Sequence, residues 1–167
     1  MEKTVEFAKI FANFAAKYND MKINLKNGID KLIFGMKQND VTAIYGKADR
    51  NYKDEDDNVI LVYNKLKMRL TFYQDEDLRL AWIVGSSPEL ELFGIKIIGK
   101  KIADVKKELA AKSITKFNQE EFDTLENYFN EENWFILQTE FEEVVKFEMG
   151  AIHNDKDDEF DWKFGKK

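Results

Sequence analysis

IFGMK at residues 33–37 returns, with two apolar exchanges, as LFGIK at residues 92–96. A helical pattern follows each phrase: NDVTAIYG (39–46) follows the first, and KKIADVKKELAAK (100–112) follows the second. Apolar residues recur in both segments at the three- and four-residue spacings of an amphipathic helix. A phrase that recurs together with its neighbours indicates an internal repeat.

The Phe-Gly pair has the same expected role in both copies. Phe34 and Phe93 are expected to fill the core where the chain enters each helix. Gly35 and Gly94 permit a tight turn or a close backbone approach, which a side chain would block.

Strand patterns complete each copy. The predicted strands are NVILVYN (58–64), KMRLTFYQ (67–74) and LRLAWIVG (78–85), then TLENYFN (124–130), NWFILQTEF (133–141) and EVVKFEMG (143–150). An offset of 65 residues makes Leu70 correspond to Phe135 and Trp82 to Phe147, whereas the helices correspond at 64 and the Phe-Gly phrases at 59. Offsets that change only between elements are typical of a duplication followed by changes in loop length.

The predicted fold class is therefore α+β, with two tandem repeats, each a helical segment plus an antiparallel β-meander, and with the two sheets side by side or continuous. An N-terminal amphipathic helix is predicted at residues 3–18. By length the chain is a single domain, 1–167. It divides into the N-terminal helix with repeat 1 (1–88), repeat 2 (89–152) and an acidic, aromatic tail (153–167). Helices then cover one face of the sheet and leave the other for solvent or a partner.

Alternation along the strands predicts which side chains are buried. Trp82 belongs to the inward set of LRLAWIVG, and Val145 to that of EVVKFEMG. The residues expected to be buried are Phe34, Val41, Leu70, Phe72, Trp82, Phe93, Val105, Leu109, Phe135, Leu137 and Phe147.

The motif Phe34-Gly35-Met36, followed by Val41, Tyr45-Gly46 and the strand LRLAWIVG, resembles the repeat of the beta-lactamase-inhibitory-protein-like fold. The resemblance covers residues 29–150. It implies that two repeats place their sheets together as a concave surface that grips another protein. Acidic proteins of this build also resemble immunity proteins of bacterial polymorphic toxin systems, which implies inhibition of a cognate toxin.

Composition and charge narrow the function classes. The chain has 14 Phe, 6 Tyr and 3 Trp, which suffice for a core, and it has no cysteine for disulfides or thiolate chemistry. No segment approaches a membrane-spanning length or a signal-peptide pattern, so we expect a cytoplasmic protein without membrane contact. Residues 1–118 carry 21 Lys/Arg and 17 Asp/Glu, whereas residues 119–162 carry 2 and 15. Such an acidic third repels nucleic acid and attracts basic partners.

Few residues point to catalysis or metal binding. The single histidine, His153, lies in a polar tail, and no nucleophile or phosphate-binding motif occurs. The run DKDDEFD (155–161) has the opening spacing of a calcium loop, but Phe160 stands where that loop needs glycine. We therefore expect no enzyme, no catalytic or metal site and no cofactor.

The outward positions of the strands favour protein binding, because exposed Tyr and Trp beside charges are typical of binding hot spots. The candidate partner-binding residues are Tyr73, Trp134, Gln138, Glu140, Glu142, Glu143, Lys146 and Glu148. The alternative is that a terminal strand or helix covers this face. Residues 159–164 (EFDWKF) are a candidate for that covering strand.

Three functions remain open at this point. The first is an immunity protein that occludes a basic toxin, such as a nuclease, through carboxylates of residues 119–161. The second is a binding or assembly module for another protein or ligand. The third is an enzyme that uses carboxylates, which requires a cleft with two converging acidic side chains.

Overall fold

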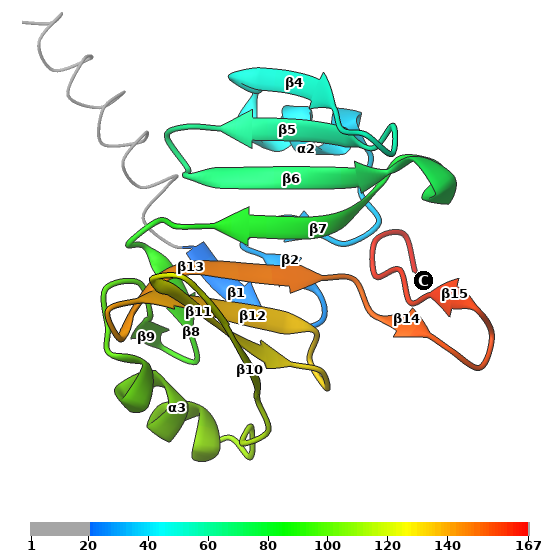
Figure 1. Ribbon diagram of the computed structural model, residues 1–167. Coiled ribbons are helices and arrows are strands. Elements are labelled where there is room, and N and C mark those ends of the chain that lie inside the picture. Colours follow the sequence, from blue (N-terminus) through cyan, green and yellow to red (C-terminus); the bar gives the residue numbers. More distant parts are fainter. Residues whose placement is uncertain (1–20, 167) are drawn as a thin grey trace, which may run out of the picture.

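The computed structural model describes residues 21–166 and contains one large antiparallel sheet of eight strands (Figure 1). In the order in which they lie across the sheet, the strands are β10 (Asn118–Phe122), β11 (Leu125–Asn130), β12 (Phe135–Glu140), β13 (Glu143–Gly150), β7 (Arg79–Gly85), β6 (Met68–Tyr73), β5 (Val59–Tyr63) and β4 (Arg50–Lys53). β4–β7 and β10–β13 are consecutive meanders, and they join where β7 pairs with β13. The antiparallel strands are thus confirmed, within a single continuous sheet. The helix predicted at residues 3–18 lies outside the described residues.

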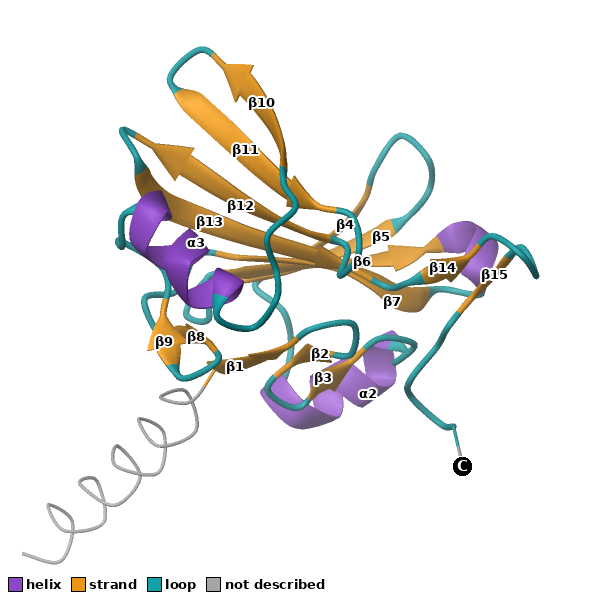
Figure 2. Ribbon diagram, turned by 90° about the horizontal axis from the view of Figure 1, so that it is seen from below, coloured by secondary structure: helices purple, strands orange, loops and turns teal. Residues whose placement is uncertain are grey.

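A smaller sheet and two helices lie on one side of the large sheet (Figure 2). The small sheet has the order β3 (Leu32–Ile33), β2 (Gly28–Ile29), β1 (Met21–Asn24), β8 (Leu90–Leu92) and β9 (Ile95–Lys96), and the helices are α2 (Gln38–Tyr45) and α3 (Ile102–Ala110). β1 and β8 pair in parallel, which the sequence did not predict. A 3-10 turn, η1 (Gln74–Glu76), and a hairpin of β14 (His153–Asn154) and β15 (Glu159–Phe160) complete the described chain. Among residues 21–166, no helix is long and apolar enough to cross a membrane.

The core lies between the large sheet and this second layer. Nine of the eleven side chains expected to be buried are buried: Phe34, Val41, Leu70, Phe72, Val105, Leu109, Phe135, Leu137 and Phe147. Full burial of one such side chain contributes about 1.5–3 kcal/mol. The exceptions are Trp82 and Phe93.

Trp82 points away from the core because β7 contains a β-bulge. Thr71 pairs with Trp82 and Phe72 with Leu80, so Ala81 has no direct partner in β6. One extra residue reverses the side on which the following side chains lie. Leu80 is therefore fully buried, whereas Trp82 is partly exposed on the opposite face. The prediction that Trp82 is a core residue is wrong.

A second bulge lies at the corresponding place in the other meander. Gln138 pairs with Lys146 and Thr139 with Val144, so Val145 is the extra residue. Val144 is fully buried and Val145 is only partly buried, which corrects the prediction that Val145 faces inward. The correspondence of Trp82 with Phe147 at offset 65 is wrong for the same reason, since Phe147 is fully buried.

The two Phe-Gly phrases have different conformations. Phe34 is fully buried, and a Cβ on Gly35 would lie 3.3 Å from Cβ of Trp162, so this glycine permits a close approach. Phe93 is 47% exposed, because Phe93 and Gly94 form the two-residue turn between β8 and β9, with φ angles of 51° and 82°. Positive φ at both central residues is the geometry of a tight hairpin turn. The prediction that Phe93 fills the core is wrong.

Ile97 occupies the place expected for Phe93. The backbone N–H of Phe34 donates to the carbonyl of Asn27 at 2.8 Å, and that of Ile97 donates to the carbonyl of Leu90 at 3.3 Å. Each hydrogen bond joins two residues that are seven positions apart, and the second pair lies 63 positions after the first along the chain. Ile97 is also buried, so an apolar side chain fills the core at this point in each half.

The C-terminal tail packs beneath one end of the large sheet. The N–H groups of Lys163 and Phe164 donate to the carbonyl of Phe34 at 3.2 and 3.0 Å. The Phe160 ring lies 6.0 Å from the ring of Tyr73 at the end of β6. The predicted covering segment, residues 159–164, therefore meets the large sheet at this end, where Phe160 packs against Tyr73 on the same side of β6 as Arg69 and Thr71.

Candidate functional site

The face of the large sheet opposite the helices is the candidate site, and we call it the open face. No helix or strand within the described part of the chain lies over it, and the β10–β11 hairpin and the β4–β5 loop rise on either side (Figure 2). Directly paired residues of antiparallel strands share a face, so the register follows one row of side chains across the sheet. From β4 to β10, this row is Arg50, Val62, Arg69, Val84, Glu148, Ile136, Phe129 and Asn118.

Three aromatic side chains on the open face, Trp82, Trp134 and Phe129, form what we call the aromatic strip. Gly150 pairs with Trp82 across β7 and β13, and a Cβ on Gly150 would lie within 2.6 Å of both indole rings. The Phe129 and Trp134 rings meet edge to face, with centroids 5.1 Å apart. Trp134 is 39% exposed, so the strip presents apolar surface to solvent.

Glu148 connects the aromatic strip to a neighbouring cation. The Trp82 indole N–H donates to Oε2 of Glu148 at 3.0 Å, and Lys146 Nζ lies 2.8 Å from Oε1. The Glu148 side chain is 16% exposed and that of Lys146 is 30% exposed. Both charges are therefore paired within the sheet, and Glu148 also accepts the hydrogen bond that orients Trp82.

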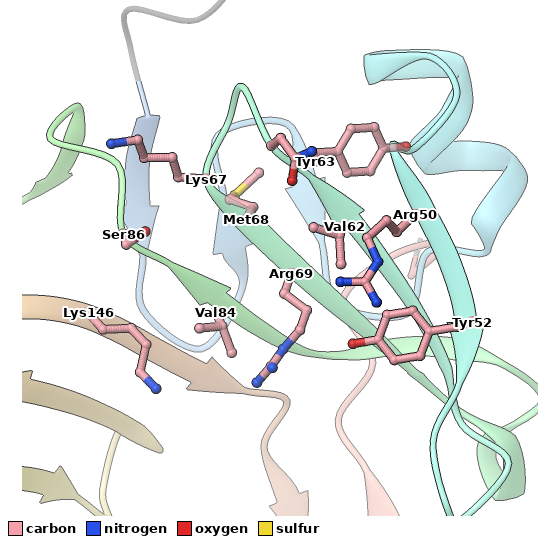
Figure 3. A pocket seen from close by; sticks show the side chains of 11 residues that line it. Arg50, Tyr52, Val62, Tyr63, Lys67, Met68, Arg69, Val84, Ser86 and Lys146 are labelled. Atoms are coloured by element: carbon pink, nitrogen blue, oxygen red, sulfur yellow. The ribbon is translucent and has the colours of Figure 1, made fainter.

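A hollow of about 440 Å³ lies on the open face beside the strip, and we call it the basic hollow. Arg50 from β4, Arg69 from β6, Lys146 from β13 and the Tyr52 ring line it, and Lys67 lies at its margin with its side chain extending away from these groups (Figure 3). No Asp or Glu is among the described residues that line it. The Arg50 guanidinium lies 5.1 Å from the Tyr52 ring centre, a cation–π contact.

Carboxylates gather at the other end of the open face, and we call this the acidic end. The register places Glu120 in a row with Asn127, Gln138 and Lys146, and it places Glu140 opposite Glu143. Their carboxylates are exposed or partly exposed, and Thr124 Oγ1 donates to Oε1 of Glu140 at 3.3 Å. The open face therefore carries opposite charges at its two ends.

Most of the sequence-predicted binding residues lie together on the open face. They are Trp134, Gln138, Glu140, Glu143, Lys146 and Glu148. Glu142 lies at the tip of the β12–β13 turn beside Phe141, which is 80% exposed.

Tyr73 lies on the same side of β6 as Arg69, but apart from this group. Its ring packs against Phe160 of the tail at the far end of β6. Burial, followed by the nearby charge of Asp54, raises the pKa of the Tyr73 hydroxyl. Tyr73 is thus a contact between sheet and tail.

Two parts of the site escaped the sequence prediction. Trp82 was assigned to the core, because alternation gives no sign of the bulge at Ala81. The basic hollow was not predicted, because the closeness of Arg69 to Arg50 and Lys146 depends on strand pairing. In the sequence, the hollow could have been inferred from basic residues at outward positions of separate strands.

The tail holds the remaining titratable cluster. His153 Nδ1 lies 3.0 Å from Asp155, and the hydrogen bond with Asp155 raises the pKa of the histidine. Hydrogen bonds from Lys163 and Lys166 lower the pKa of Asp161 to about 2. In residues 21–166, no group of three or more His, Cys, Asp or Glu side chains is placed to hold a metal ion.

Comparisons with known proteins inform the fold alone. No protein-family model matches the sequence. No curated protein matches it either. A solved structure of a DUF4309 family protein from Bacillus subtilis is similar over 83% of this chain and 93% of its own, with a TM-score of 0.50 and 12% identity.

Two further solved structures are less similar. One is an extracellular protein containing an SCP domain from Bacillus anthracis, with a TM-score of 0.44 and 14% identity. The other is a cysteine-rich secretory protein from Staphylococcus aureus, with a TM-score of 0.43 and 15% identity. In both comparisons 68% of this chain is covered, and the chain spans only 42% of the length of the other protein.

Proposed function

We propose that this protein is a non-catalytic protein-binding module that grips its partner with the open face. The observation that carries the proposal is the aromatic strip, which lies uncovered by described elements on the same face as the basic hollow and the acidic end. Aromatic side chains at the centre of a polar rim are the usual composition of binding hot spots. Glu148 orients Trp82 before any partner arrives, which reduces the entropy lost on binding.

We further infer that the partner is a toxin and that the protein acts as its immunity protein in the cytoplasm. The support is electrostatic: residues 119–162 carry 15 Asp/Glu against 2 Lys/Arg, and part of this charge lies at the acidic end. A toxin that acts on nucleic acid has a basic active-site rim, which such a surface attracts and covers. The same field disfavours nucleic acid and anionic membrane as partners of the acidic end.

The two halves of the molecule are proposed to be duplicated copies of one unit. In each half, a hairpin of short strands precedes a helix and a four-stranded antiparallel meander. Each meander has its bulge between the third and fourth strands. This shared order supports both the duplication and the resemblance to two-repeat inhibitory proteins. The concave surface implied by that resemblance corresponds to the open face.

The test is binding to the protein encoded beside this one, measured by titration calorimetry together with inhibition of its toxic activity. Trp134→Ala and a triple variant, Glu140→Lys with Glu142→Lys and Glu143→Lys, are compared with wild type after their fold is checked. Trp134→Ala is expected to weaken binding by about 2 kcal/mol or more, and the triple variant to slow association.

A matched control reverses three charges elsewhere: Asp75→Lys, Glu76→Lys and Glu108→Lys. Asp75 and Glu76 lie on η1 and Glu108 on α3, outside the strands that form the open face. This control is expected to bind like wild type. Equal binding by all variants would place the interface elsewhere, and binding without inhibition would favour an assembly module over an immunity protein.

A further inference from the structure

We propose that the basic hollow receives an acidic segment of the partner protein, whose carboxylates pair with Arg50 and Arg69. This inference rests on the proposed function, and it adds a second contact of opposite charge to the one at the acidic end. The partner is then a protein with both a basic surface and an acidic protrusion.

The register brings the two arginines together. Arg50 pairs with Val62, and Val62 pairs with Arg69, so the two side chains leave the same face from strands two positions apart. That separation is roughly 10 Å at the backbone, because neighbouring strands lie about 4.8 Å apart. Both side chains line the hollow; the Arg50 guanidinium lies beside Val62, whereas the Arg69 side chain extends away from Val62 (Figure 3). Each guanidinium presents several N–H donors in a fork that fits a carboxylate.

The hollow holds an excess of positive charge. Within residues 21–166, no carboxylate lies at ion-pair distance from Arg50, Lys67 or Arg69, whereas Lys146 is paired with Glu148. Like charges gathered on one surface repel each other, and an arriving carboxylate relieves that repulsion. The local field is thus opposite in sign to the net charge of −6.

A polypeptide suits this site better than an isolated anion. Arg50, Lys67 and Arg69 are exposed, so a small ion bound there stays hydrated and gains little. A folded partner that rests on the adjoining aromatic strip excludes water and strengthens each ion pair. β4 is also the outermost strand of the sheet, and its exposed edge offers backbone groups to an extended segment.

The occupant is a foreign segment rather than the acidic tail of the same chain. Residues 153–164 are held at the other end of β6 by Phe160 and by the backbone of Phe34. A second copy fits poorly, because the rising β10–β11 and β4–β5 segments keep two open faces apart (Figure 2).

The first experiment uses a fluorescent peptide rich in Asp and Glu, with fluorescence anisotropy as the readout. Wild type is compared with Arg50→Glu/Arg69→Glu and with a control, Lys31→Glu/Lys107→Glu, which changes the net charge equally at exposed sites outside the hollow. Arg50→Glu/Arg69→Glu, which we call the hollow variant, is expected to bind the peptide at least about tenfold more weakly than wild type. The control is expected to bind within about twofold of wild type. Circular dichroism checks that each variant is folded.

Other probes identify a wrong occupant. Inorganic phosphate and single-stranded DNA are added as competitors, and sedimentation velocity measures self-association. The proposal is overturned if wild type does not bind the peptide, if both variants lose binding equally, or if DNA binds in preference to the peptide. If wild type self-associates and the hollow variant does not, the hollow binds a second copy of this chain, and the proposal is overturned as well.

A final comparison separates this inference from the proposed function. The hollow variant and Trp134→Ala are both titrated against the protein encoded beside this one. Loss of affinity in both supports the hollow as part of the interface. If only Trp134→Ala loses affinity, the proposal for the hollow is wrong and the proposed function stands. If neither variant loses affinity, both proposals are wrong.

Discussion

The two halves of the large sheet share one architecture but present opposite charges on the open face. Each half is a meander of four antiparallel strands with a bulge between the third and fourth strands. β4–β7 carries Arg50 and Arg69 on this face, whereas β10–β13 carries Glu120 and Glu140. The buried positions of both halves are apolar because they pack against the second layer. The open positions carry no such constraint, so they are able to diverge in charge while the scaffold stays the same.

The largest expected effect contrasts the two phenylalanines of the repeated phrase. Phe34→Ala removes a fully buried ring and is expected to lower the free energy of unfolding by about 3–5 kcal/mol. Phe93→Ala removes a ring that is 47% exposed and is expected to lower it by less than about 1 kcal/mol. Urea unfolding of both variants measures the difference. Equal losses would contradict the different conformations of the two phrases.

A second contrast concerns the glycines that end β7 and β13. Gly150→Ala places a methyl group within 2.6 Å of Trp82 and Trp134, and is expected to cost about 1–3 kcal/mol and to shift the tryptophan fluorescence. Gly85→Ala meets the flexible end of Leu90 at 2.9 Å, so it is expected to cost less and to leave the fluorescence unchanged. Unchanged fluorescence in Gly150→Ala would contradict the packing of the aromatic strip.

Glu148→Ala tests whether a charge holds Trp82 of the aromatic strip in place. It leaves the indole N–H of Trp82 and the ammonium of Lys146 without their partner, with an expected loss of about 1–2 kcal/mol in denaturant unfolding. Glu148→Gln keeps an acceptor for the indole and is expected to lose less. If the two variants unfold alike, the hydrogen bond to Trp82 contributes nothing.

The ionisation of Tyr128 probes the acidic half. Burial, followed by the hydrogen bond to Glu126, raises the pKa of Tyr128 to about 12. Because the folded-state pKa lies above the usual value of about 10, the tyrosine stabilises the fold below pH 10, and this contribution is lost as the pH rises to about 12. Absorbance titration of tyrosinate checks this. Glu126→Gln is expected to lower the pKa only in part, since burial is the larger cause.

The smallest effect belongs to the β8–β9 turn. Phe93→Asn creates Asn-Gly, the pair best suited to two consecutive positive φ angles. It is expected to raise the free energy of unfolding by up to about 1 kcal/mol, measured beside Phe93→Ala, which keeps the unfavourable φ. A loss of stability in Phe93→Asn would mean that the Phe93 ring packs more than its exposure indicates.

Local patterns in the sequence determined much of the scaffold. Alternation in KMRLTFYQ placed Leu70 and Phe72 in the core, and helical spacing did the same for Val105 and Leu109. These predictions succeed because the side-chain period of a strand or helix is a property of the local backbone. The charge difference between the two parts of the chain was also readable from composition alone.

Tertiary structure decided where the side chains of the site meet. The bulge at Ala81 turned Trp82 from the core to the open face, and a bulge depends on how one strand pairs with its neighbour. The pairing of β7 with β13 then brings Trp82 within hydrogen-bond distance of Glu148, which is 66 residues away along the chain. The hollow between Arg50 and Arg69 likewise exists only because β4, β5 and β6 pair in one register. Local periodicity determines on which face of its own strand or helix a side chain lies. Pairing between distant strands determines which side chains lie next to it, and the proposed binding site consists of side chains from different strands.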